Sequence, residues 1–170
     1  VRLVKGTSVY TSDFTPPTES FESDANTSLL IGSSLPYIKD SSSNSHDITV
    51  TGDVSTMPLA PYDYSEYNPS IHGGSVYFDG SGDYIDTGLN NVATDFTFEC
   101  WVNTTVGGML MARYQSGSAL DGFIIDSTSG FPVIQINTNA NNLNGTVNLK
   151  DGKWHHLAFV RDSNVCKIFV

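Results

Sequence analysis

Apolar and polar side chains alternate along much of the chain with a period of two residues. In the segment 95–103, DFTFECWVN, Phe96 and Phe98 fall on one face, and Glu99 and Trp101 fall on the other. This period is typical of β-strands, because successive side chains of a strand point to opposite faces. No window of a dozen residues has the spacing of three and four that marks an amphipathic helix.

Several further segments are short, rich in β-branched or aromatic residues, and bounded by turn-forming residues. The pattern predicts strands over 47–50, 74–78, 95–103, 109–114, 122–125, 133–136, 154–162 and 165–170. Turn sequences lie at 79–83, 106–108, 127–130, 139–145, 150–153 and 161–164. Many short strands joined by turns predict an all-β fold, an antiparallel β-sandwich or jelly roll, with little or no helix.

Two of these strands carry bulky apolar groups on both faces. They are 95–103 and 154–162, the second reading WHHLAFVRD. A sheet with one face open to water has no need of such groups on that face. We therefore expect both strands to be central, with a second face that lies under loops or lines a concave surface, and Glu99 and Trp101 share that second face.

The first 27 residues differ in character from the rest. The segment 1–12 starts with VRLVKGTSVY, which reads as one strand, and 13–27 contains two adjacent prolines and several acidic residues. A Pro-Pro pair favours an extended, semi-rigid chain, so 13–27 is predicted to be a linker. A new unit is expected to start at residue 28.

Charge narrows the classes of partner. The chain has 8 Lys and Arg against 18 Asp and Glu, a net charge of −10. Phosphate backbones repel so acidic a chain, which argues against nucleic-acid binding, and anionic membranes are disfavoured for the same reason. No apolar run is long enough to predict insertion into a membrane.

Three segments together resemble the laminin G-like, concanavalin A-like jelly roll. They are GSVYFDGSGDYIDTG at 74–88, DFTFECWVNTT at 95–105 and DGKWHHLAFVRDSNVCKIFV at 151–170. In that family a strand, tight turn and strand come first, then a strand of the form F-T-[IF]-E-x-W-V, then a W-H-H-[LV]-A-x-V-R strand that leads into K-[IL]-[FY]-V. The resemblance covers about 28–170 and implies a concanavalin A-like sandwich.

The front of the chain resembles the closing strand and exit linker of such a domain, as found in tandem copies within virion and tail-fibre proteins of marine phages. This resemblance divides the chain into three parts. Residues 1–12 would be the closing strand of a preceding or permuted jelly-roll unit, 13–27 a Pro-rich acidic linker, and 28–170 a laminin G-like domain truncated at its C-terminal end. The closing strand could then come from within the chain or from another subunit.

One set of residues is suited to sugar binding. A sugar ring stacks its C–H face on an aromatic side chain, and amides and carboxylates bond its hydroxyls. Trp101, with Glu99 and Asn103 on the same face, is the best such set, and Tyr114 and Gln115 could lie near it. The alternative is that the loop 57–70 simply covers Trp101.

A second polar segment is either a glycan contact or a solvated loop. It holds Asn137, Asn139, Asn141, Asn142 and Asn144.

Asp79, Asp83 and Asp86 crowd the turn after the strand 74–78. Members of the wider fold often hold Ca²⁺ at the rim of the sandwich, and Asp79 and Asp83 are the candidate ligands here. Asp in a D-G-S-G-D turn also bonds nearby backbone N–H groups, and turn capping is the preferred interpretation. No other cofactor is indicated.

The residues argue against an enzyme. Glucanases of this fold use clustered carboxylates on one strand, and none of Glu19, Glu22, Glu66 and Glu99 is followed two residues later by another carboxylate. His155 and His156 point to opposite faces of one strand, so they cannot both bind one metal or substrate, and structural roles are expected for both.

The two cysteines, Cys100 and Cys166, do not form a disulfide framework. Each is expected to be a small buried apolar residue, with a mutual bridge as the alternative.

Taken together, the resemblance implies a non-enzymatic structural or adhesive module of a phage virion, in a fibre, tail or capsid decoration. It would be extracellular as part of the virion, would contact other virion proteins or copies of itself as a homo-oligomer, and would bind host surface glycans in addition. The alternative is a carbohydrate-binding module of a secreted bacterial adhesin or multidomain enzyme.

Overall fold

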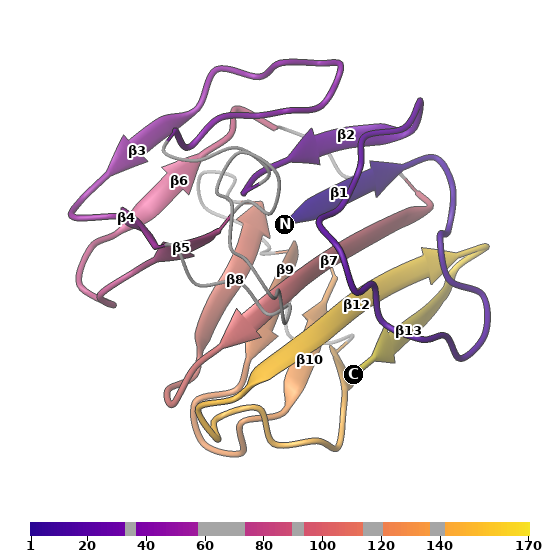
Figure 1. Ribbon diagram of the computed structural model, residues 1–170. Helices are drawn as coiled ribbons and strands as arrows, with labels where there is room; N and C mark the ends of the chain where they lie inside the picture. Colours follow the sequence, from indigo (N-terminus) through magenta and orange to yellow (C-terminus); the bar gives the residue numbers. More distant parts are fainter. Residues whose placement is uncertain (33–36, 58–73, 90–93, 114–120, 137–141) are drawn as a thin grey trace.

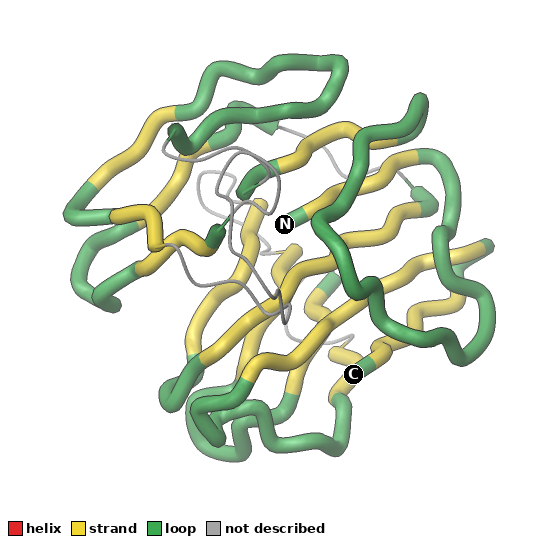
Figure 2. Tube along the Cα trace, viewed as in Figure 1, coloured by secondary structure: helices red, strands yellow, loops and turns green. Residues whose placement is uncertain are grey.

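The computed structural model describes residues 1–32, 37–57, 74–89, 94–113, 121–136 and 142–170. These residues form strands, turns and loops, and no helix occurs among them (Figure 2). In particular, the described part of the chain has no helix long and apolar enough to span a membrane. The strands are β1 (Arg2–Lys5), β2 (Thr27–Leu30), β3 (Thr49–Thr51), β4 (Ser55–Met57), β5 (Ser75–Tyr77), β6 (Tyr84–Asp86), β7 (Phe96–Asn103), β8 (Gly108–Arg113), β9 (Asp121–Ile125), β10 (Pro132–Gln135), β11 (Asn142–Asn144), β12 (Trp154–Asp162) and β13 (Val165–Phe169).

Two antiparallel sheets form the body of the molecule (Figure 1). One has five strands in the order β13-β12-β7-β1-β2, and the other has four in the order β11-β10-β9-β8. Aromatic rings from both sheets meet between them: Phe98 of β7 stacks on Phe123 of β9 at 4.7 Å, and Phe159 of β12 lies 5.1 Å from Phe123. The prediction of an all-β antiparallel sandwich is confirmed.

The long strands β7 and β12 are central, as their two apolar faces indicated. Phe98 pairs with Leu3 of β1 on one side and with Phe159 of β12 on the other. These three side chains are at most 1% exposed and point into the core between the sheets. The alternate residues of β7 and β12 therefore face outward, and Glu99 and His156 are among them.

The segments around the turn 79–83 do not pair as a simple hairpin. β5 pairs with β4, and β6 pairs with β3, as two separate two-stranded antiparallel sheets. Gly52 lies at the corner between β3 and β4 with φ +86°, where a Cβ would stand 1.9 Å from an oxygen of Asp83. The expected strand–turn–strand unit is present along the chain, but its two strands, β5 and β6, pair with β4 and β3 rather than with each other.

The N-terminal strand belongs to the same sandwich as the rest of the chain. β1 lies between β7 and β2, and its register aligns Leu3 with both Phe98 and Leu29. Residues 6–26 then cross the outer face of the five-stranded sheet before the chain enters β2 (Figure 1). The segment 13–27, expected to act as a linker, instead packs Phe14 and Phe21 against that face.

The sequence pattern missed some short elements. β2 and β4 carry no clear alternation, and β11 was expected to be part of the turn 139–145. β11 is exposed along its length and is held in the sheet by backbone pairing of Ile134 with Leu143, so side-chain pattern alone does not mark it as a strand.

Candidate functional site

The candidate site lies on the outer face of the five-stranded sheet, where the N-terminal segment covers it. β7 contributes Glu99 and Trp101 to this face, and β12 contributes His156. The pairing of His156 with Trp101 across the two strands brings their rings to 5.3 Å, edge to face. Tyr10 and Phe14 come from the N-terminal segment and close over the same place.

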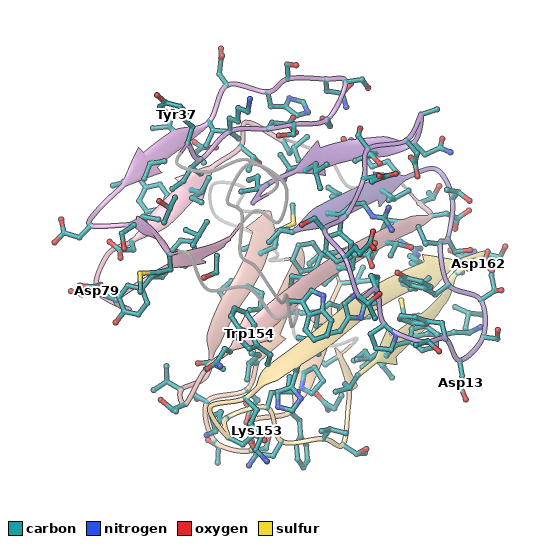
Figure 3. The ribbon with its side chains drawn as sticks, viewed as in Figure 1. Asp13, Tyr37, Asp79, Lys153, Trp154 and Asp162 are labelled. Atoms are coloured by element: carbon teal, nitrogen blue, oxygen red, sulfur yellow. The ribbon has the colours of Figure 1, made fainter. Side chains whose placement is uncertain are left out.

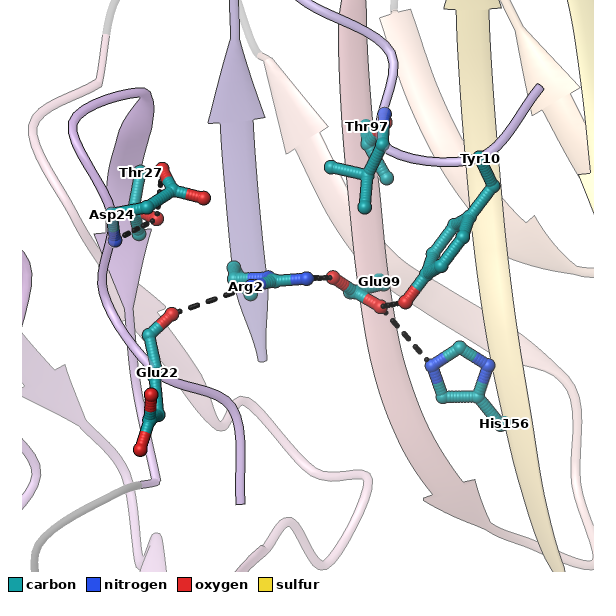
Figure 4. Close-up of polar contacts among 9 residues, drawn as sticks. Arg2, Tyr10, Glu22, Asp24, Thr27, Thr97, Glu99 and His156 are labelled. Atoms are coloured by element: carbon teal, nitrogen blue, oxygen red, sulfur yellow. Dashed lines mark hydrogen bonds and ion pairs between the residues drawn. The ribbon is translucent and has the colours of Figure 1, made fainter. Parts of the chain in front are cut away.

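Glu99 is the centre of a buried polar network (Figure 4). Its carboxylate is 0% exposed. The Nε of Arg2 donates to Oε1 at 2.6 Å, and the Arg2 guanidinium completes an ion pair with the same oxygen. The hydroxyl of Tyr10 donates to Oε2 at 2.6 Å, and Nε2 of His156 lies 3.2 Å from Oε2.

The network keeps Glu99 ionised inside the protein. Burial raises the pKa of a carboxyl group, but hydrogen bonds from His156 and Tyr10 and the charge of Arg2 outweigh burial here, so the pKa of Glu99 lies below its usual value. Burial also raises the pKa of Tyr10, and its bond to the Glu99 carboxylate raises it further. At neutral pH Tyr10 is thus the donor and Glu99 the acceptor.

Aromatic rings enclose the imidazole of His156. Trp101, Phe14, Phe21 and Tyr10 all meet it edge to face, with ring centres 5.3 to 6.3 Å away. Tyr10 and Phe14 also stack on each other, and the guanidinium of Arg2 lies 5.2 Å from the centre of the Phe21 ring. The N-terminal segment is therefore fixed to the sheet by both polar and aromatic contacts.

The residues predicted to bind a glycan do not form one open surface. Glu99 is the clear correction: its carboxylate faces Arg2, Tyr10 and His156 rather than solvent, because the N-terminal segment covers the face on which it lies. The side-chain amide of Asn103 donates to the carbonyl of Gly152 at 3.1 Å.

Of the remaining predicted glycan residues, Trp101 is half-buried beside His156. Tyr114 and Gln115 lie outside the described residues, as does most of the loop 57–70 that was expected to cover Trp101. The sequence placed Trp101 and Glu99 on one face correctly, but it did not indicate what covers that face.

Asp79 and Asp83 cap the turn between β5 and β6. Asp79 lies at the edge of the molecule opposite Asp13 in Figure 3. Asp83 accepts the backbone N–H of Asp53 at 2.7 Å and that of Asp79 at 3.0 Å, and Asp79 accepts the N–H of Ser81 at 2.6 Å. This geometry is that of the preferred turn-capping interpretation. Within the described ranges no group of three or more His, Cys, Asp or Glu side chains could hold a metal ion.

The two histidines of β12 have separate structural partners. His155 bonds Asp151 at 2.8 Å near the start of the strand, and His156 bonds Glu99 on the outer face. Sequence reasoning expected structural roles for both but missed Arg2 and Tyr10 as partners of Glu99. The sequence held one signal for these contacts. The predicted strand VRLVKGTSVY ends in the aromatic residue Tyr10, and the segment after it contains Phe14 and Phe21.

The architecture defines the class of the protein, an all-β antiparallel sandwich. A profile of the concanavalin A-like lectin/glucanases superfamily matches residues 79–170, which is more than half of the chain. The chain belongs to this superfamily. Comparison with curated proteins gave no match, and comparison with solved structures gave none either.

Proposed function

We propose that this chain is a non-enzymatic adhesive module that contacts surface glycans. Membership of the concanavalin A-like superfamily indicates a carbohydrate-binding or adhesive module in the coarse sense. The observation that favours adhesion over hydrolysis is the state of Glu99, the glutamate of the central strand β7, which is buried, ionised and bonded to three partners.

A glycosidase needs two carboxyl groups at the scissile bond, and one of them must hold a proton near neutral pH. The pKa of Glu99 is displaced in the opposite direction, and its oxygens have no free access to a sugar. Glu19 and Glu22 lie in the N-terminal covering segment, and they are exposed there. These features support a binding role without hydrolysis.

The finer proposal is a structural or adhesive module of a phage virion, where the module meets other virion proteins, copies of itself and host surface glycans. It rests on the resemblance of the front of the chain to phage virion and tail-fibre proteins. The net charge of −10 is compatible with an extracellular particle surface and opposes contact with nucleic acid.

The test is a glycan array probed with the purified chain, together with a reducing-sugar assay on soluble β-glucans. We expect binding to a subset of glycans and no release of reducing ends. Cleavage of any β-glucan above the level of a Glu99→Gln variant would overturn the non-enzymatic proposal. Absence of binding across the array would overturn the adhesive one.

The same family match supports a second candidate, a carbohydrate-binding module of a secreted bacterial adhesin or multidomain enzyme. The two candidates differ in assembly. A virion module is expected to sediment as a homo-oligomer in analytical ultracentrifugation, whereas a carbohydrate-binding module is expected to sediment as a monomer.

A further inference from the structure

An exposed apolar surface lies on the two small strand pairs, β3–β6 and β4–β5, at the left of Figure 1. Tyr77 is 55% exposed, Phe78 is 46% exposed and Tyr84 is 56% exposed. Met57 is exposed too, and the register that pairs Ser55 with Tyr77 puts Met57 and Tyr77 on the same face of β4–β5. Neighbouring exposed apolar groups are a mark of interaction surfaces.

Each exposed tyrosine of this surface has a carboxylate two residues later. The sequence contains two Tyr-x-Asp units, Tyr77–Asp79 and Tyr84–Asp86, one on either side of 80–82. Tyr84 and Asp86 are alternate residues of β6, so their side chains point to the same face, and both are exposed. Asp79 is exposed as well, and Figure 3 shows it at the edge of the molecule. These four residues are called the tyrosine–aspartate face below.

Backbone hydrogen bonds hold the carboxylates of this face in place. Asp79 accepts the N–H of Ser81 at 2.6 Å, and Asp86 accepts the N–H of Gly88 at 2.9 Å. Asp83, the residue before the second unit, accepts the N–H of Asp79 at 3.0 Å and so joins the two units. Because the face is preformed, a partner that binds it loses less conformational entropy in ordering it.

The negative charge of the face has no positive counterpart nearby in the chain. No Lys or Arg occurs from residue 40 to residue 112. Among the described residues, neither Asp79 nor Asp86 forms an ion pair. An ammonium or guanidinium group brought against this face would meet an aromatic ring and a carboxylate together, so cation–π and ionic attraction would both act on it. The chemistry therefore selects a cationic partner.

We propose that the tyrosine–aspartate face docks a segment of another protein that carries exposed arginine or lysine side chains. Two Tyr-x-Asp units suit two such side chains, and arginine is favoured because its planar guanidinium stacks on a ring while it bonds a carboxylate. A second copy of this chain is a poorer occupant. Its net charge is also −10, and Arg2, Lys150 and Lys167 are already bonded within their own chain. This inference does not depend on glycan binding.

The first experiment measures binding of a short Gly/Ser peptide with two arginines to the full chain by isothermal titration calorimetry at low salt. We expect this peptide to bind, and we expect no detectable binding when citrulline, which lacks the charge, replaces both arginines. Tyr77→Ser and Tyr84→Ser each remove an exposed ring, so each is expected to weaken the affinity about threefold. Asp86→Asn keeps an oxygen for the N–H of Gly88 but removes the charge, and about the same loss is expected.

The chain offers a matched control for each kind of variant. Tyr37 is 73% exposed, but the residue two positions later is Lys39, so Tyr37→Ser removes an exposed ring from a Tyr-x-Lys unit. Glu19→Gln removes one exposed negative charge from the N-terminal segment, as Asp86→Asn does from the face. Both controls are expected to leave the affinity unchanged. If Glu19→Gln weakens binding as much as Asp86→Asn, the peptide is attracted by net charge alone and the proposal is overturned.

A second readout maps the contact without any substitution. A carbodiimide joins a carboxylate to a lysine amine that touches it, so the peptide is made with two lysines and the cross-links are located by mass spectrometry. We expect Asp79 and Asp86 to carry most of the cross-links. The exposed acids of the N-terminal segment serve as the comparison, namely Asp13, Glu19 and Glu22. Cross-links spread evenly over both groups would overturn the assignment of the face.

The remaining outcomes separate this proposal from its alternatives. Failure of the arginine peptide to bind at low salt would overturn it, whatever the glycan array shows. A concentration-dependent dimer in analytical ultracentrifugation that Tyr84→Ser abolishes would assign the face to a second copy of the chain, and it would overturn a different protein as the partner.

Discussion

Replacement of Arg2 by methionine is the sharpest test of the buried network. Met keeps much of the length of the side chain but removes the positive charge beside Glu99, which is 0% exposed, and the guanidinium that lies over the Phe21 ring. Breaking a buried ion pair on one side costs about 3–5 kcal/mol, because it leaves a buried charge without compensation. Tyr10 and His156 still donate to the carboxylate, so we expect the lower end, about 3 kcal/mol.

The assay is thermal and urea unfolding at pH 7. For a chain of this size, about 3 kcal/mol corresponds to a fall in Tm of about 6–12 °C. The double variant Arg2→Met with Glu99→Gln removes the buried charge as well, and it is expected to recover part of the loss. A loss below about 1 kcal/mol for Arg2→Met, or no recovery in the double variant, would refute the assignment of Arg2 as the compensating charge.

The same network determines how the stability of the folded chain changes with pH. The pKa of Glu99 is lower in the folded chain than in the unfolded one, so the unfolded chain takes up a proton first as the pH falls. The contribution of Glu99 to stability is therefore fully present above the usual glutamate pKa, about 4.3. It is lost as the pH falls through the pKa of Glu99 in the folded chain. Wild type should lose stability below about pH 4.5 more steeply than Glu99→Gln, and parallel curves would contradict the network.

Three further predictions concern other parts of the fold. Gly52→Ala should lower the Tm at least twice as much as Gly80→Ala. Both glycines have positive φ, but of the two only Gly52 would place a Cβ against the Asp83 carboxylate. Equal losses of Tm in calorimetry would contradict this packing of Gly52 against Asp83. EDTA should leave the Tm unchanged, because Asp83 is occupied by backbone N–H groups, and a fall would instead favour a calcium site. Burial raises the pKa of Cys100 to about 12, so Cys100 should resist a thiol reagent in the folded chain. The half-buried Cys166 should react first. Mass spectrometry of the labelled peptides gives the order of reaction, and labelling of Cys100 before Cys166 would contradict the prediction.

The sequence predicted the long strands well and the cover of the sheet poorly. β7 and β12 alternate over eight and nine residues, so their faces could be assigned from the period of two alone. The segment 13–27 lacks such a period, and its two adjacent prolines predicted a linker. Composition indicates how stiff a segment is, but it does not indicate which surface the segment packs against. Only the register that brings Arg2 beside Glu99 shows that a glutamate on an apolar strand is a buried anchor rather than a sugar ligand.

The same limit applies to the candidate sites. Trp101 and Glu99 were correctly placed on one face, yet accessibility depends on residues about ninety positions away in the chain, such as Tyr10. The interpretation of Asp79 and Asp83 depended less on distant residues, since a D-G-S-G-D turn bonds mainly to its own backbone.

The position of β1 also has a kinetic consequence. One edge of β1 bonds to β2, a near neighbour in the sequence, but the other edge bonds to β7, with Leu3 beside Phe98. Contacts between residues so far apart in the chain require a large loop to close, and proteins rich in them fold in milliseconds to seconds. Until β7 pairs with it, β1 exposes an open edge, so the step that inserts β1 is the one at which a second copy of the chain could compete for the vacant place in the sheet.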